Sequence, residues 1–228
     1  MKTILGIGAH FDDCAFGVPG ILLQAVRKHY RVVILSIIGD YSNWPPTKGR
    51  EKEFVAGVTE VCKERGVEMR FLTYASHKFD VNADTKAAVA KAVGDIKPDT
   101  AFILWEHDNH HDHSVASVLG KIALRHGGRV LNEDAFKSPR EIYAFDNGPR
   151  HTVGFEPNTY VNVTDVWPEA MEWLGKLMAL QRNVVYDAKA ADSALQAKET
   201  LARYRGAACG AKYAEAVWST TPRTQEIL

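Results

Sequence analysis

The alternation of short apolar runs with amphipathic segments along the first half of the chain constrains the fold more than any other feature. The apolar runs are rich in β-branched or aromatic residues, as strands buried on both faces of a sheet are. They cover residues 3–8, 31–38, 68–74 and 100–105. Segments with helical character lie between them, at residues 18–29, 49–65 and 83–96. This order predicts βαβ units and an α/β fold, a Rossmann-like three-layer sandwich with a mostly parallel central sheet.

The pattern changes in the second half of the chain. A helix over residues 114–126 is expected to end at Gly127 and Gly128, because glycine readily adopts the left-handed conformation that closes helices. Two strands and a helical stretch are predicted beyond it, at residues 140–146, 159–166 and 168–205. The sequence contains no internal repeat and no low-complexity linker, so we expect one domain spanning residues 1–228.

Charge and cysteine content narrow the classes of function. Lysine plus arginine and aspartate plus glutamate both total 28, so the formal net charge is zero and no basic field favours nucleic acid or an anionic membrane. We therefore expect a small-molecule partner. The three cysteines form no CxxC pair, which argues against a disulfide framework and a thiolate zinc site and favours the reducing cytoplasm. The sequence contains no run of about 18 apolar residues that would predict a membrane span, and its first apolar run is too short for an export signal.

Side chains that can bind a metal or carry a proton follow two of the predicted strands. The motif AHFDD follows the first strand, and EHDNHHDHS, residues 106–114, follows the fourth. In a parallel sheet the carboxyl ends of the strands share one edge, where ligands bind. If these strands are close neighbours, the following side chains face one cleft: His10, Asp12, Asp13, Asp108, His110, Asp112 and His113.

Imidazole and carboxylate without thiolate suit a catalytic divalent metal, because zinc accepts neutral histidine nitrogen and aspartate oxygen. In the simpler alternative, the aspartate pair satisfies helix or loop amides and the histidine-rich loop is solvated surface. GIGAH also begins like a dinucleotide-binding turn, but Phe11 stands where that motif needs its third glycine. A non-catalytic Rossmann-like binding module is therefore the alternative from a different class of protein.

Four segments resemble the LmbE/PIG-L family of zinc-dependent N-acetylglucosaminyl deacetylases. AHFDD is similar to the AHPDD motif of that family, and HHDH at residues 110–113 is similar to its HPDH motif. GREKEF at residues 49–54 resembles the family's Arg-x-x-Glu at the start of a helix. ARYRGAACGAKYAEA at residues 202–216 resembles its C-terminal signature. The likeness spans nearly the whole chain, and four motifs in the family's order are more specific than any one of them.

The resemblance implies an enzyme, a metal-dependent hydrolase that removes an N-acetyl group from an amino sugar or its conjugate. Zinc, or another divalent metal that accepts the same ligands, would be bound by three residues: His10, Asp13 and His113. Asp12 would act as the general base. His110, oriented by Asp112, would stabilise the oxyanion. Arg50 matches a family arginine that faces the substrate.

Three residues depart from the family pattern. Phe11 and His111 replace prolines in the two motifs, and Cys14 replaces a glutamate. Loss of two prolines, which fix φ near about −65°, can loosen the loops. Cys14 is expected to be a small buried thiol or, alternatively, to contact the metal.

Several alternatives stay open at the level of the substrate. An amidase acting on a thiol conjugate or another non-sugar N-acyl group is the second enzyme candidate, and a zinc protein that has lost turnover is a third. The loop at residues 39–48 is expected to face the substrate, with Trp44 stacking on a sugar ring or anchoring the loop. His77 and His151 are interpreted as incidental. Apolar surface on helices over residues 168–180 and 186–205 could support a homo-oligomer.

Overall fold

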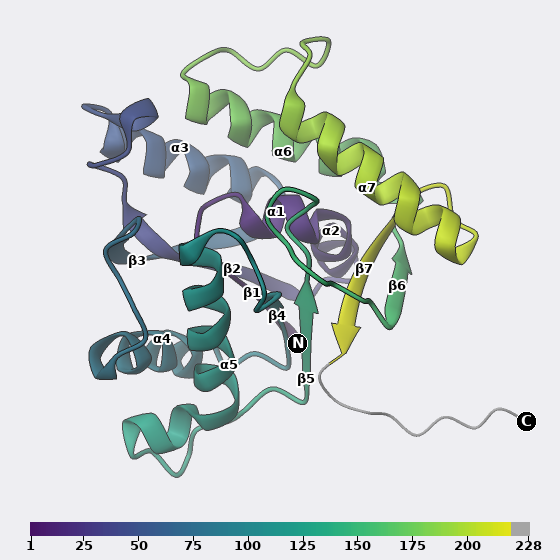
Figure 1. Cartoon of the computed structure of the whole chain (residues 1–228). Helices are drawn as coiled ribbons and strands as arrows, with labels where there is room; N and C mark the ends of the chain where they lie inside the picture. Colours follow the sequence, from purple (N-terminus) through teal and green to yellow (C-terminus); the bar gives the residue numbers. More distant parts are fainter. Residues whose placement is uncertain (220–228) are drawn as a thin grey trace, which may run out of the picture.

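Seven strands within residues 1–219, the part of the chain that the computed structural model describes, form one sheet in the order β3-β2-β1-β4-β5-β7-β6 (Figure 1). Their bounds are β1 (Thr3–Gly8), β2 (Arg31–Asp40), β3 (Val67–Ala75), β4 (Thr100–Leu104), β5 (Glu141–Phe145), β6 (Thr159–Asn162) and β7 (Ala214–Ser219). The first five strands are parallel, whereas β7 runs antiparallel to both β5 and β6. All six residues of β1 are buried, as expected for a central strand covered on both faces.

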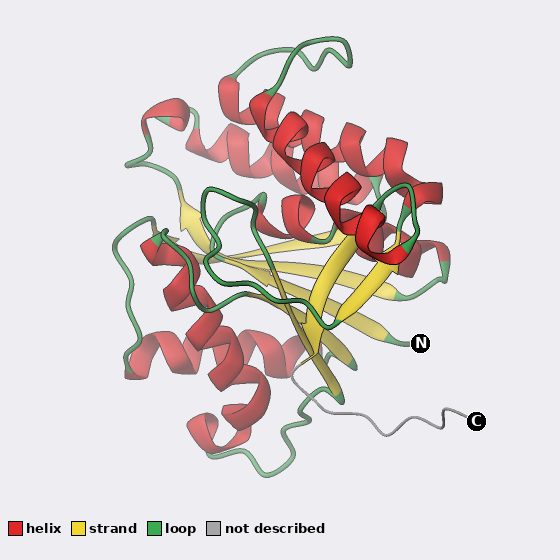
Figure 2. Ribbon diagram, turned by 45° about the vertical axis from the view of Figure 1, so that its right-hand side comes forward, coloured by secondary structure: helices red, strands yellow, loops and turns green. Residues whose placement is uncertain are grey.

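Helices cover both faces of the sheet, which confirms the predicted three-layer α/β architecture (Figures 1 and 2). On one face, α4 (Ala83–Ile96) packs against α5 (His111–Leu131). The other face carries α1 (Asp13–Gly17), α2 (Pro19–Arg27), α3 (Glu51–Glu64), α6 (Trp167–Arg182) and α7 (Ser193–Cys209). Two 3-10 turns, η1 (Pro45–Thr47) and η2 (Thr164–Val166), precede α3 and α6. Across residues 1–219, no helix combines the length and apolar character needed to cross a membrane.

Helix α5 continues through the two glycines that were expected to end it. A Cβ atom at Gly127 would lie 2.3 Å from the ring of Phe136, and one at Gly128 would lie 2.8 Å from the carbonyl oxygen of Glu133. The glycines therefore allow the chain beyond the helix to pack closely against it. The helix ends instead at Asn132, whose φ of 55° is left-handed and whose backbone N–H donates to the carbonyl of Gly128.

The C-terminal part of the sheet differs most from the prediction. The strand expected at residues 159–166 ends at Asn162 and is followed by η2, and β7 was not predicted. The apolar pattern of β7 is interrupted by Glu215, which is nevertheless buried. Its carboxylate accepts hydrogen bonds from the backbone N–H groups of Gly20 and Ile21, and it lies 3.2 Å from Nζ of the buried Lys198. A buried charge is tolerated when it is paired in this way. Because the charged residue breaks the run of apolar residues, the strand could not be recognised from the hydrophobic pattern of the sequence.

The strand order reverses between β1 and β4, which are hydrogen-bonded neighbours. In a doubly wound sheet this reversal opens a crevice at the carboxyl ends of the strands, because the connections on its two sides lead to opposite faces. The two polar motifs follow β1 and β4. The fold therefore brings them to the same crevice.

Candidate active site

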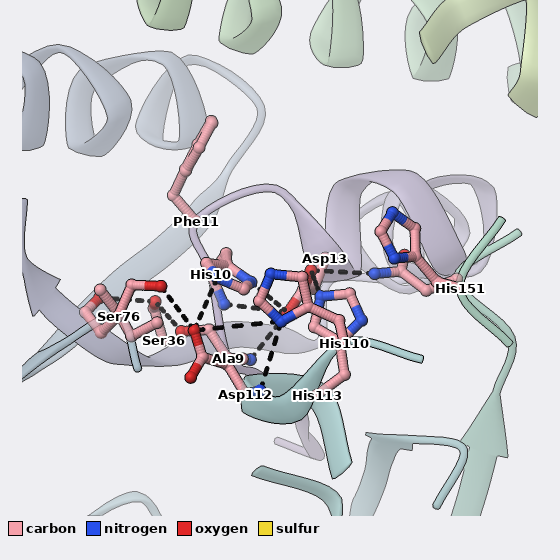
Figure 3. A network of polar contacts seen from close by, with 12 residues as sticks. Ala9, His10, Phe11, Asp13, Ser36, Ser76, His110, Asp112, His113 and His151 are labelled. Atoms are coloured by element: carbon pink, nitrogen blue, oxygen red, sulfur yellow. Dashed lines mark hydrogen bonds and ion pairs between the residues drawn. The ribbon is translucent and has the colours of Figure 1, made fainter. Parts of the chain in front are cut away.

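A cavity of about 570 Å³ lies at the carboxyl edge of the sheet. Loops that follow the first five strands all contribute to its lining. Five of the seven predicted site residues line it: His10, Asp12, Asp13, His110 and His113. Asp112 lies beside it, with Oδ2 3.3 Å from His10 Nε2, whereas Arg50 does not line it. Figure 3 shows His10, His110 and His113 gathered around Asp13, with Asp112 on one side and His151 on the other.

Asp13 is the centre of this arrangement and is 3% exposed. Its Oδ2 atom accepts hydrogen bonds from the backbone N–H groups of Ala9 and His10, at 2.7 and 2.9 Å. Its Oδ1 atom accepts one from Asn147 Nδ2 at 2.9 Å and lies 3.2 Å from His113 Nε2. Burial by itself raises the pKa of this carboxyl, but the charges of His113 and His10 outweigh it and hold the pKa well below its usual range.

The three residues predicted to bind metal have their ligand atoms close together. His10, Asp13 and His113 can each offer an atom, with all of these atoms within 4.8 Å of one another. His10 Nδ1 lies 3.7 Å from Asp13 Oδ2. One nitrogen of each imidazole therefore faces the same carboxylate, which is the convergence that a metal site requires.

The other nitrogen of each imidazole lies beside a second buried carboxylate. His10 Nε2 is 3.3 Å from Asp112 Oδ2, and His113 Nδ1 is 3.1 Å from Asp108 Oδ2. Burial lowers the pKa of both imidazoles, but these carboxylates and Asp13 outweigh it and raise the pKa of His10 to about 9 and that of His113 to about 10. Without a metal, each ring therefore carries a proton on both nitrogens, and metal binding must displace the proton from the nitrogen that becomes the ligand.

Asp12 lines the cavity and is half-buried. It occupies the position before α1, but its side chain makes no capping hydrogen bond to the described part of that helix, so the capping alternative does not account for it. Burial and the negative charge of Asp13 raise the pKa of Asp12 to about 6. Asp12 is therefore a carboxylate beside the cluster, with a proton affinity suited to exchange near neutral pH.

His110 occupies the N-cap position of α5, and its Nδ1 atom accepts the backbone N–H of Asp112 at 3.2 Å. Because Nδ1 is the acceptor, the neutral ring carries its proton on Nε2. Burial and the charges of His10 and His113 lower the pKa of His110 to about 4, which keeps the ring neutral. The Asp112 carboxylate lies 4.0 Å from His110 Nδ1, so the hydrogen bond to this ring comes from the Asp112 backbone.

Two histidines that the sequence interpretation set aside also line the cavity. His77 follows β3 and stacks on His110, with ring centroids 5.1 Å apart. His151 lies in the loop after β5, with its ring centroid 5.1 Å from that of His113. Neither belongs to a recognisable motif. Only their positions after two further parallel strands could have suggested that they reach the same crevice.

Phe11 points away from the imidazoles, toward the helices on one face of the sheet (Figure 3). Its ring packs edge-to-face against Tyr41 and Phe54, at centroid distances of 6.0 and 4.9 Å. Its backbone N–H donates to the Tyr41 hydroxyl at 3.1 Å, a bond that proline could not make. Trp44 is half-buried against the same rings and also lines the cavity, so it anchors the loop and faces the site.

Cys14 lies in α1, packs against β1 and is fully buried. A Cβ atom at Gly6 would lie 2.8 Å from its sulfur, so the thiol packs closely against a residue of the central strand. Burial raises its pKa well above the usual range. It is absent from the cavity lining, as expected of the small buried thiol rather than of a metal contact.

Arg50 joins two walls of the cavity. Its guanidinium donates to the carbonyl oxygens of Pro46 and Gln181, at 2.9 and 2.7 Å, and lies over the ring of Phe54. It therefore fastens the loop at residues 39–48 to the end of α6. A direct contact between Arg50 and a substrate stays a prediction.

We expect Phe11 and His111, which stand where the family motifs have proline, to respond differently when proline is introduced. Phe11→Pro removes a buried ring and the N–H that Tyr41 accepts, so the free energy of unfolding should fall by about 3 kcal/mol. His111 is the first residue of α5 and follows a residue with an extended backbone, ψ 119°, and both features suit proline. His111→Pro should therefore change stability by less than about 1 kcal/mol.

Urea unfolding followed by circular dichroism measures both variants. Phe11→Leu is the matched control at the first position, because it retains the backbone N–H and most of the buried volume. Equal losses of stability in the two proline variants would contradict this explanation.

Comparisons with known proteins agree with this fold. The model of the PIG-L family, described as GlcNAc-PI de-N-acetylase, matches residues 5–124. The 4-carboxy-2-hydroxymuconate hydratase GalB from Pseudomonas putida is 17% identical, with a TM-score of 0.79 and 100% of each chain covered. A conserved protein from Thermus thermophilus is 20% identical, with a TM-score of 0.79 over 100% of this chain and 98% of that one. The N,N'-diacetylchitobiose deacetylase from Pyrococcus horikoshii is 18% identical, with a TM-score of 0.75 over 96% and 84%.

Proposed function

The chain belongs to the PIG-L family, whose model matches just over half of its 228 residues, and from this premise we propose that it is a metal-dependent N-deacetylase. Its substrate would be an N-acetylated amino sugar or a conjugate of one. The observation that carries the proposal is the convergence of His10, Asp13 and His113 beside Asp12 in one cavity. All four residues lie within the matched range.

The residues fit a divalent metal. Two buried or half-buried imidazoles each direct one nitrogen at the Asp13 carboxylate and the other at a second carboxylate, an arrangement typical of histidine ligands in metalloproteins. This nitrogen and oxygen donor set favours zinc and also accepts iron, cobalt or manganese. When bound, such an ion lowers the pKa of a coordinated water toward about 7 and polarises a carbonyl group.

The remaining groups would carry the proton and the developing charge. Asp12 takes a proton from the attacking water and returns it to the departing amine, so that hydrolysis of the amide yields acetate and a free amine. Its pKa of about 6 allows both transfers near neutral pH. His110, with its proton on Nε2, donates a hydrogen bond to the oxygen that becomes negative in the transition state. Asp112, whose carboxylate accepts from Ser76 and His77, holds the start of α5 in place.

A second candidate is hydration of a carbon–carbon double bond. The hydratase from Pseudomonas putida aligns with this chain over the full length of both. Hydration also begins with removal of a proton from water, so Asp12 and the metal cluster could serve either reaction.

A screen with and without a chelator tests the proposal. We expect acetate release from N-acetylated amino sugars or their conjugates, complete loss of release after dialysis against a chelator, and recovery on addition of zinc. Non-sugar N-acyl compounds and thiol conjugates form a second panel. Loss of absorbance from an unsaturated hydroxy acid such as 4-carboxy-2-hydroxymuconate, without acetate release from any N-acetyl compound, would replace deacetylation with hydration.

A further inference from the structure

Asp108 is a buried carboxylate at the candidate site to which the proposed reaction assigns no role. Its side chain is 1% exposed, and it lies in the loop between β4 and α5. A buried carboxylate is costly unless its oxygens have partners. The partners of Asp108 therefore indicate why it is there.

Each oxygen of Asp108 contacts a different residue of the site. Oδ1 accepts the backbone N–H of His110 at 2.7 Å, which fixes the chain just before α5. Oδ2 lies 3.1 Å from Nδ1 of His113. The Nε2 atom on the opposite side of that ring lies 3.2 Å from Asp13 Oδ1. The imidazole of His113 is thus held between two carboxylates, of which only Asp13 belongs to the candidate metal cluster.

The contact at Nδ1 determines which nitrogen of His113 can bind a metal. A ligand imidazole must be neutral and must present a lone pair on one nitrogen, with its proton on the other. The negative oxygen of Asp108 favours the proton on Nδ1 and leaves Nε2 free to face Asp13. Nδ1 is buried and makes no hydrogen bond of standard geometry within residues 1–219, so its polar interaction with Asp108 is the ion-pair contact at 3.1 Å.

We propose that Asp108 is a positioning residue that holds His113 with its Nε2 lone pair toward Asp13 and thereby sets the affinity of the site for a divalent metal. This inference rests on the proposed function, because it assumes that His10, Asp13 and His113 bind the ion. In this proposal Asp108 neither binds the ion nor takes part in the proton transfers assigned to Asp12. Through the backbone of His110, the same carboxylate also aligns the group that faces the oxyanion.

A direct role for Asp108 as a metal ligand is the competing explanation. Asp108, His113 and His151 could also offer ligand atoms to one ion, through the Nδ1 side of His113. The geometry favours positioning, because His151 Nδ1 is 4.0 Å from an Asp108 oxygen that already accepts the His110 N–H. The two explanations predict different numbers of bound ions.

Competition between the metal-free protein and a chromophoric chelator for zinc measures affinity and stoichiometry without any turnover. We expect one zinc per chain in both the wild type and Asp108→Asn, with a dissociation constant about 10- to 100-fold higher in the variant. In the metal-free proteins, the ¹⁵N spectrum of the His113 ring in its neutral form should show the proton on Nδ1 in the wild type, with a smaller Nδ1–H population in the variant. A purely structural role would not change this signature.

Glu106→Gln is the matched control. It removes one negative charge from the same loop, where Glu106 pairs with Lys121 and contacts no residue of the cluster. Its affinity for zinc should equal that of the wild type. If Asp108→Asn does not fold, Asp108→Glu provides the same comparison, because it keeps the charge and displaces the carboxylate by one methylene group.

Three results would overturn the proposal. Equal zinc affinity in Asp108→Asn and the wild type would remove the positioning role and leave the proposed function intact. Two zinc ions in the wild type and one in the variant would make Asp108 a ligand. Failure of the wild type to bind any divalent metal would overturn the proposed function together with this inference.

Discussion

Asp12→Asn is expected to lower kcat for deacetylation by about 10²- to 10⁴-fold while zinc remains bound at one ion per chain. Asparagine has nearly the same shape as aspartate but cannot take a proton from water. The Asp12 side chain lines the cavity without capping α1, so the substitution removes no hydrogen bond that holds the described fold together. The effect should therefore lie in kcat, with little change in stability.

Steady-state kinetics, metal analysis and thermal unfolding of the same preparation separate these quantities. Asp40→Asn is the matched control, because Asp40 is another carboxylate that lines the cavity but is the exposed last residue of β2. Its kcat should change by much less. Full activity in Asp12→Asn would remove Asp12 from the mechanism, and loss of zinc from that variant would make Asp12 a ligand.

His113→Ala is expected to abolish stoichiometric zinc binding and, with it, activity. The substitution removes one of the three proposed ligand atoms and leaves Asp13 and Asp108 facing each other across the space of the ring. Loss of a ligand should weaken binding by more than the roughly 10- to 100-fold that is typical for a residue supporting a ligand. Zinc bound after dialysis, measured by atomic absorption, reports the result directly.

His107→Ala is the comparison for this variant. His107 lies in the same loop, but its side chain is 67% exposed and contacts Glu106 instead of the cluster. It should bind zinc as the wild type does. Retention of one tightly bound zinc ion by His113→Ala would place the metal elsewhere; within residues 1–219, His10, His110 and Asp112 form the other group of ligand atoms that does not include His113.

The sequence predicted those parts of the fold that depend on local pattern. β1 to β4 were recognisable because strands buried on both faces are continuously apolar, and their order implied that AHFDD and HHDH meet at one edge. β7 was missed because its buried charge, Glu215, is neutralised by Lys198, a residue on the preceding helix. A local sequence pattern cannot show that a charged residue is paired with a residue on another helix or strand.

The same distinction applies to the candidate site. The residues of the two motifs were identified because each motif is contiguous in sequence. Asn147, which donates to Asp13, and His151, which lies beside His113, come from the loop after β5 and follow no motif. Arg50 was expected at the substrate because its neighbourhood resembles a family motif; in the structure one of its guanidinium nitrogens donates to the carbonyl oxygens of Pro46 and Gln181, and a contact with the substrate stays a prediction. Only the folded arrangement distinguishes such roles.

The hydrogen bond from the Phe11 N–H to the Tyr41 hydroxyl predicts that these two positions depend on each other in evolution. Proline at position 11 would leave the Tyr41 hydroxyl, in a side chain that is 3% exposed, without its donor, and phenylalanine at position 41 would leave the Phe11 N–H without its acceptor. Each single exchange thus passes through a chain in which one of the two groups has lost its partner in this hydrogen bond. A homologue with proline at the first position is expected to lack tyrosine at the second, so the motif and the end of β2 should change as a pair.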